Sequence, residues 1–91
     1  MVKVVFPSII VKVTNGEREV IISASTINEA LAELSTRYGK SFKETIFDSS
    51  GKPKRFLNFY LNGRNVRFIN NLNTPLKITD VLTILPSIGG G

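Results

Sequence analysis

The residues best placed to take part in chemistry stand at the C-terminus, where the sequence closes on Pro86, Ser87, Ile88 and glycines 89–91. A run of glycines has high conformational entropy and no side chains to pack, so we expect it to contribute little to a fold. Six extended residues reach about 20 Å, which is enough to enter the active site of a neighbouring enzyme. The run predicts either a terminus that threads into a narrow tunnel, or a frayed end or remnant of recombinant expression.

Side chains elsewhere in the sequence offer little chemistry. There is no cysteine and no histidine, which excludes a disulfide framework, a Cys/His zinc site, a Cys or Ser–His nucleophile pair and a histidine acid or base within this chain. The seven acidic residues are scattered singly, apart from Glu17 and Glu19, which we interpret as the solvated face of a strand. We therefore predict no metal site, and we expect any chemistry to involve the chain's end.

The length and the charge of the chain limit the class of protein to which it can belong. A chain of 91 residues predicts one modest domain. No apolar run approaches the ~18 residues of a membrane span, and the N-terminus lacks a signal peptide, so we expect a cytoplasmic protein with no membrane partner. The net charge is +5, but the basic residues are mostly dispersed, and the tightest group, residues 52–55, reads as a solvated loop. We expect no nucleic-acid partner; the excess charge would steer the domain toward an acidic partner surface.

A helix is the clearest of the elements that must position the tail. Thr26 followed three residues later by Glu29 forms a capping-box pattern, and Gly39 stands where a C-terminal cap belongs. Between them, apolar residues recur at the spacing of one helical face: Ile27, Ala30, Leu31, Leu34 and Tyr38. The pattern predicts a helix between Thr26 and Gly39.

Strands are predicted on both sides of this helix. Residues 2–13 indicate a strand bent at Pro7, which a tight turn at Asn15-Gly16 connects to a second strand at residues 18–23. After a short helical turn at 42–47 and a loop at 48–54, residues 55–61 indicate a third strand. A turn at Asn62-Gly63 then leads to a short return strand that holds Val66 and Phe68. Following a loop at 70–75, residues 80–85 indicate a last, apolar strand.

This order of elements predicts an α+β fold of the β-grasp (ubiquitin-like) type. A mixed sheet of four to five strands would have one main helix packed across it, with the first and last strands parallel in the middle. Residues 1–86 would form the domain and residues 87–91 a flexible tail. We expect a monomer when the protein is free.

Fold and tail together resemble the MoaD/ThiS family of sulfur carriers, relatives of ubiquitin, over essentially the whole chain. The sequence looks closest to the CysO-like branch. The residues that carry the likeness are Arg55-Phe56, Asn58, Tyr60 to Asn62, Val66-Arg67-Phe68, Leu72, Thr74, Asp80, Thr83-Ile84-Leu85-Pro86 and the tail Ser87-Ile88-Gly89-Gly90-Gly91.

Two features depart from the family's pattern. Many relatives carry an acidic, glycine-containing turn before the last strand, where this chain has Lys77-Ile78-Thr79-Asp80. The family ends in two glycines, whereas this chain ends in three. Counting from Leu85 places Gly90 and Gly91 on the family pair, which favours Gly91 as the reactive end, with Gly90 as the alternative if the chain is trimmed.

The resemblance implies a carrier rather than an enzyme. A ubiquitin-activating-like adenylating enzyme would use ATP to activate the Gly91 carboxylate, which would become a thiocarboxylate, and this chain would bind no cofactor of its own. The sulfur acceptor would be a cysteine synthase-like or molybdopterin synthase large subunit-like protein, with thiamin-thiazole assembly also open. Ser87, Ile88, Gly89 and Gly90 would lie in the partner's tunnel, where Ile88 would be the apolar anchor, unless it packs back on the domain.

The partner would dock on exposed apolar positions of the sheet face away from the helix. Leu57, Phe59 and Leu61 are the candidates, and which of them lie there depends on the strand register. Two other functions remain open. The tail would serve a ubiquitin-like modifier joined to lysine amines equally well, or the chain is a plain binding module with an incidental glycine tail.

Overall fold

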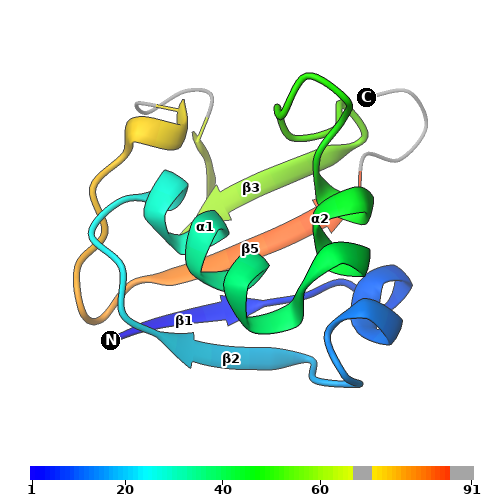
Figure 1. Ribbon diagram of the computed structural model, residues 1–91. Coiled ribbons are helices and arrows are strands. Elements are labelled where there is room, and N and C mark those ends of the chain that lie inside the picture. Colours follow the sequence, from blue (N-terminus) through cyan, green and yellow to red (C-terminus); the bar gives the residue numbers. More distant parts are fainter. Residues whose placement is uncertain (67–70, 87–91) are drawn as a thin grey trace.

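The computed structural model describes residues 1–66 and 71–86. In this part of the chain, strands form one sheet with two α-helices on one of its faces (Figure 1). The elements in chain order are β1 (Val2–Val5), the 3-10 helix η1 (Ser8–Val13), β2 (Glu19–Ile22), α1 (Ile27–Tyr38), α2 (Lys40–Ile46), β3 (Leu57–Leu61), β4 (Arg64–Asn65), the 3-10 turn η3 (Asn71–Asn73) and β5 (Val81–Pro86). None of the helices described is long and apolar enough to cross a membrane.

The sheet has the strand order β2-β1-β5-β3-β4, which confirms the predicted mixed β-grasp arrangement. β1 and β5 run parallel at the centre, and the β1–β2, β3–β5 and β3–β4 pairs are antiparallel. Parallel neighbours are usually buried and apolar, and these two strands are rich in valine, isoleucine and leucine. Because β5 lies between β1 and β3, the strand that leads into the tail has a neighbouring strand on each of its edges.

The predicted helix is confirmed as α1. The Thr26 hydroxyl accepts a hydrogen bond from the Glu29 N–H at 3.1 Å, and the Glu29 carboxylate accepts one from the Ser25 N–H at 3.0 Å. These bonds satisfy amides that would otherwise lack partners at the helix start. The predicted apolar face packs on the sheet, because Ile27, Ala30, Leu31 and Leu34 are all buried. Gly39 ends the helix with a φ of 87°, which glycine adopts without strain.

The prediction of a single bent strand over residues 2–13 is wrong. β1 ends at Val5, and residues 8–13 form η1 instead. Pro7 has no N–H for the sheet, and its carbonyl accepts a hydrogen bond from the Ile10 N–H at 3.1 Å, which starts a 3-10 turn. This turn carries Ile10 into the core, where it is 1% exposed. The predicted turn at Asn15-Gly16 is present, with positive φ at both residues.

α2 replaces the predicted short helical turn and joins the helical layer to η1. Its Phe42 side chain is fully buried and meets Phe6 and Tyr38, with ring centroids 6.3 and 5.5 Å apart. Aromatic rings in such edge-on or tilted arrangements stabilise beyond their buried area. The cluster therefore connects β1, α1 and α2 at the end of the sheet where β5 finishes.

The return strand lies earlier in the chain than predicted, and the assignment of Val66 to it is wrong. β4 covers only Arg64–Asn65, which pair with Leu61 and Tyr60, and Val66 is buried just beyond it. The other residue predicted in this strand, Phe68, lies outside the described residues. The turn at Asn62-Gly63 is confirmed, with φ values of 53° and 87°.

A side-chain clamp connects this turn to the start of β5. The Asn62 amide donates to the Asp80 carboxylate at 2.9 Å, and its oxygen accepts from the Val81 N–H at 2.9 Å. The Lys77 N–H donates to the other Asp80 oxygen at 2.8 Å. The hydrogen bond from Asn62, followed by that from the Lys77 N–H, holds the pKa of Asp80 below its usual value.

This clamp predicts a loss of stability in acid. Because the pKa of Asp80 is lowered in the folded state, its contribution is complete above the ordinary aspartate pKa of about 3.9 and is lost as the pH falls through the folded pKa. Asp80→Asn is expected to lower stability at neutral pH and to flatten the decline of the unfolding free energy below about pH 4. Urea unfolding at a series of pH values measures this. Glu33→Gln removes the same charge from an exposed position on α1 and serves as the control; equal slopes for Asp80→Asn and the wild type would contradict the prediction.

Candidate functional site

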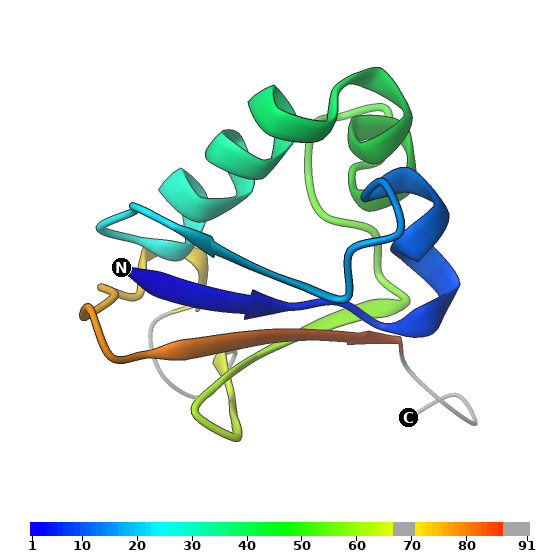
Figure 2. The same cartoon turned by 90° about the horizontal axis from the view of Figure 1, so that it is seen from below.

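The strand that bears the tail fixes where the tail begins. Residues Ser87, Ile88, Gly89, Gly90 and Gly91 lie outside the described residues. The last described residue, Pro86, pairs with Leu57 at the start of β3. The tail therefore leaves the sheet from the end of its central strand, at the end of the molecule that also holds η1 and α2 (Figures 1 and 2).

The prediction that Leu57, Phe59 and Leu61 form a docking surface is wrong. Their exposed fractions are 4%, 5% and 8%, and all three face the helices. The register explains this: Phe59 lies opposite Ile84 and Leu61 opposite Leu82, and paired residues share a face of the sheet. Both partners in β5 are fully buried. These side chains belong to the core.

The opposite face of the sheet is the one available to a partner. Figure 2 shows α1 and α2 on one side of the sheet, and no helix of the described chain covers the other. We call this uncovered side the open face; its residues are Lys3, Val5, Glu19, Ile21, Asn58, Tyr60, Val81, Thr83 and Leu85. Ile21 is 50% exposed and Leu85 is 42% exposed. These residues were not predicted from the sequence. Side chains alternate between the two faces along residues 80–85, so Leu85 is assigned to the open face as soon as its neighbours in the strand are known to be buried.

Charges on the open face are paired across neighbouring strands. The Lys3 ammonium lies 3.6 Å from the Glu19 carboxylate, with both side chains about half exposed. Exposed ion pairs of this kind contribute little stability. On an edge strand such as β2, a charged side chain also disfavours pairing with a second sheet. The open face thus combines exposed apolar side chains with polar ones and with a charged pair on β1 and β2.

Tyr38 has a pKa that its surroundings clearly change. Burial raises the pKa of Tyr38 to about 12, and the hydrogen bond that its hydroxyl donates to Glu17 at 2.7 Å acts in the same direction. The hydroxyl therefore stays protonated at neutral pH. Within residues 1–66 and 71–86, no group of three His, Cys, Asp or Glu side chains could hold a metal ion.

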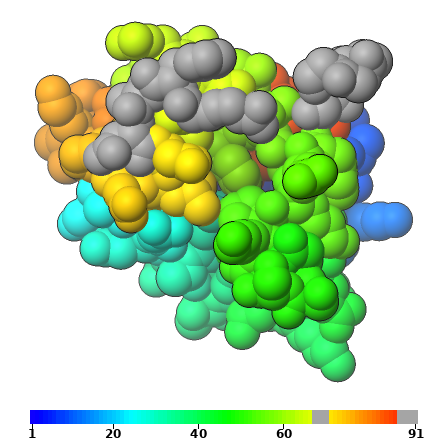
Figure 3. Space-filling view, turned by 90° about the horizontal axis from the view of Figure 1, so that it is seen from above, coloured from blue at the N-terminus to red at the C-terminus, as the bar shows by residue number. Residues whose placement is uncertain are grey.

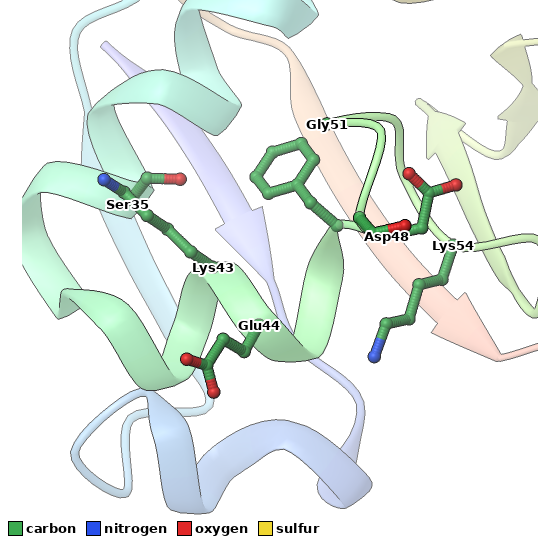
Figure 4. A pocket seen from close by; sticks show the side chains of 8 residues that line it. Ser35, Lys43, Glu44, Asp48, Gly51 and Lys54 are labelled. Atoms are coloured by element: carbon green, nitrogen blue, oxygen red, sulfur yellow. The ribbon is translucent and has the colours of Figure 1, made fainter.

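A cavity on the helical face carries charged side chains but does not form an active site. It has a volume of about 610 Å³ and lies between the end of α1, α2 and the loop at residues 48–54. Lys43, Glu44 and Lys54 border it but point in different directions (Figure 4). Ser35 donates its hydroxyl to the Leu31 carbonyl at 2.8 Å, so no base activates it. The arrangement offers no nucleophile with a partner.

Comparison with known proteins decides the family. A sequence model of the ThiS family matches residues 4–91, which include both the β-grasp domain and the tail. The chain belongs to the ThiS family. The match confirms the predicted likeness over essentially the whole chain.

Relatives within and around the ThiS family are carriers and modifiers. The sulfur carrier protein CysO of Mycobacterium tuberculosis is 36% identical over 92 residues, covering 99% of this chain and 98% of CysO. Its crystal structure matches with a TM-score of 0.86, 34% identity and coverage of 97% and 100%. A chain of the Amycolatopsis orientalis BexX/CysO complex matches with a TM-score of 0.85 and 33% identity, covering all of both chains.

A third likeness is to a protein modifier. The small archaeal modifier protein 1 from Methanosarcina acetivorans matches with a TM-score of 0.86 and 28% identity, covering 99% of this chain and 95% of that one. Members of the ThiS family and these neighbours thus share a β-grasp domain, and the names of the relatives describe small carriers and modifiers.

Proposed function

We propose that this chain is a sulfur carrier whose terminal glycine carboxylate is the reactive group. The observation that carries the proposal is the ThiS-family match, which runs through the domain and on to Gly91. The full-length likeness to CysO, a sulfur carrier protein, supports it. The name of this relative describes a carrier, which favours a carrier rather than a catalyst.

The chemistry follows from the weak reactivity of a carboxylate. Because its charge is delocalised and well solvated, a free carboxylate is a poor electrophile. A partner enzyme would transfer AMP from ATP to the Gly91 carboxylate and release pyrophosphate. Sulfide would then attack the acyl carbon, the acyl–oxygen bond to AMP would break, and a thiocarboxylate would remain. Nucleotide, metal and acid–base groups would be supplied by the partner.

The fold serves this chemistry by presenting the tail from a rigid base. β5 pairs with β1 through its first half and with β3 as far as Pro86, so the strand that precedes the tail is held within the sheet. Leu85, on the open face, is the last outward-facing apolar residue before the tail. A partner that surrounds the tail would also contact this face, which would exclude water from the acyl-adenylate.

Two classes of partner belong to the proposal. The first is a ubiquitin-activating-like adenylating enzyme, which would use ATP in the cytoplasm. The second is a sulfur acceptor, for which a cysteine synthase-like protein is favoured by the likeness to CysO. A molybdopterin synthase large subunit-like or thiamin-thiazole acceptor would use the same thiocarboxylate.

Intact mass tests the proposal directly. The chain is incubated with ATP, a sulfide source and each of several candidate adenylating enzymes, and its mass is measured before and after. Replacing one carboxylate oxygen by sulfur is expected to add about 16 Da. Reactions without ATP are the control. No gain with any competent enzyme would exclude the carrier function.

A protein modifier is the second candidate function, favoured by the likeness to small archaeal modifier protein 1. The same activated carboxylate would form an amide with a lysine amine of another protein. Such adducts resist reducing agents and would appear as a ladder of larger species, whereas a carrier gives a free thiocarboxylate. The mass measurement and the adduct pattern therefore separate the two functions.

A further inference from the structure

We propose that a groove between η1, α2 and the segment before β3 is a docking site for an acidic segment of the enzyme that receives the tail. We call it the η1–α2 groove; it is lined by Ile9, Ile10, Lys12, Val13, Ser41, Glu44, Thr45, Lys54 and Phe56. The inference rests on the proposed function, because a chain that hands its tail to an enzyme needs a surface that holds the enzyme beside the tail.

Exposed apolar side chains make the groove suitable for protein contact. Ile9 is 52% exposed and Phe56 is 43% exposed, so two large apolar side chains of the described residues meet solvent in one groove. Its volume is about 450 Å³, enough for one or two apolar side chains of a partner. An apolar patch of this kind with polar margins marks an interaction surface.

The charge around the groove selects an acidic occupant. The groove has Lys12 and Lys54 at its margin, and its one carboxylate, Glu44, lies 3.7 Å from the Lys40 ammonium. η1, α2 and residues 47–56 together hold six cations and two carboxylates, whereas the rest of the sequence has six cations and five carboxylates. Most of the net charge of +5 therefore gathers at this end of the molecule.

The second carboxylate of this end, Asp48, does not line the groove. Asp48 accepts hydrogen bonds from the Ser50 hydroxyl at 2.6 Å and from the Ser50 and Lys52 N–H groups, and the Ser50 hydroxyl is the main cause of its lowered pKa. It is occupied within its own loop. Among the described residues, no carboxylate forms an ion pair within 4 Å of Lys12 or Lys54.

The groove also lies where a partner holding the tail must be. Phe56 precedes Leu57, and Leu57 pairs with Pro86, the residue from which the tail departs. Figure 3 shows η1 (blue) beside the segment from α2 to β3 (green) at one edge of the molecule. Opposite charges beside the docking point raise the association rate as well as the affinity.

A protein segment fits this groove better than a nucleic acid does. Single-stranded nucleic acids use several aromatic platforms for stacking, and this groove has one, Phe56. Its other large apolar side chains are aliphatic, and these offer no flat surface on which a base could stack. A peptide segment in which acidic residues flank an aliphatic one would complement this groove. Its carboxylates would face the two lysine ammonium groups, and its aliphatic side chain would contact the apolar residues of the groove.

The first test titrates the 15N-labelled full chain with a synthetic peptide of alternating acidic residues and leucines. Amide shifts are expected in η1, α2 and residues 54–56. Lys12→Glu with Lys54→Glu is expected to weaken binding at least about tenfold, since two attractions become repulsions. Arg64→Glu with Lys77→Glu makes the same charge change at the other end of the sheet and is expected to weaken it less than about twofold. A peptide with alanine in place of leucine should bind several-fold more weakly.

The same variants are then assayed with any enzyme that produces the mass gain. The groove variant is expected to lose at least about tenfold in kcat/KM with kcat unchanged, and the control variant to stay within about twofold. Peptide shifts on the open face, equal losses in both variants, or tighter binding of an RNA oligonucleotide at the same amides would overturn the inference. A chain that binds the peptide in the groove but gains no mass would overturn the proposed function and leave the groove standing.

Discussion

A chain that ends at Gly89 is expected to show no gain of about 16 Da with any adenylating enzyme that modifies the full-length chain. Two extended residues span about 7 Å, so their loss withdraws the carboxylate from the partner's catalytic groups by that distance. β5 cannot release a residue to lengthen the tail again. Pro86 pairs with Leu57, and a slip of one residue would turn the β5 side chains to the other face of the sheet. Misplacement by even 1 Å can cost about 100-fold in rate.

A chain that ends at Gly90 is the informative companion to this variant. If Gly91 is the reactive end, the shorter chain is expected to be modified far more slowly than the full-length one. If the chain is trimmed before use, the chain ending at Gly90 is expected to react at least as fast. Ser87→Ala keeps the length of the tail and serves as the control. Full modification of the chain ending at Gly89 would show that the reactive group lies elsewhere.

Replacing the buried aromatic Phe42 is expected to cause the largest loss of stability among single substitutions. Phe42→Ala removes a fully buried ring that contacts both Phe6 and Tyr38, which predicts a loss of about 3–5 kcal/mol. A domain of this size has a total stability of about 5–10 kcal/mol, so the variant would be close to unfolding at 37 °C. Urea or thermal unfolding measures the effect.

Phe56 provides a matched control for this substitution. Phe56→Ala makes the same chemical change at a side chain that is 43% exposed, and its cost is expected to be under about 1 kcal/mol. It is nevertheless expected to weaken docking at the η1–α2 groove, which separates stability from partner binding. Phe42→Leu keeps most of the volume and should cost less than about 2 kcal/mol. Equal losses for Phe42→Ala and Phe56→Ala would contradict the packing described here.

Local signals in the sequence determined the helix and the turns of this protein. The capping residues Thr26 and Glu29, and the Asn62-Gly63 pair, act through neighbouring backbone groups, so their effect can be read without the fold. The apolar composition of the first and last strands likewise indicated that they pair at the centre of the sheet. Pro7 was read as a bend within a strand, but whether the chain continues as a strand or a 3-10 turn depends on where Ile10 can be buried.

The docking surface could not be predicted from the same information. Alternation along residues 57–61 shows that two faces exist but does not tell which one meets the helices, and this led to the wrong assignment of Leu57, Phe59 and Leu61. The pairing of β3 with β5 fixed the answer by placing these side chains opposite buried partners.

The sequence by itself led to the proposal that the reactive group stands at the C-terminus, since the chain lacks cysteine and histidine and carries a glycine run in its tail. Only the tertiary structure decided which surfaces surround the point where the tail begins. η1 ends at Val13 and α2 begins at Lys40, so η1 is distant in sequence from α2 and residues 54–56, and the packing of Phe6, Tyr38 and Phe42 brings these segments to one end of the sheet. Contacts between such distant segments depend on burial of the whole core, which no local pattern encodes.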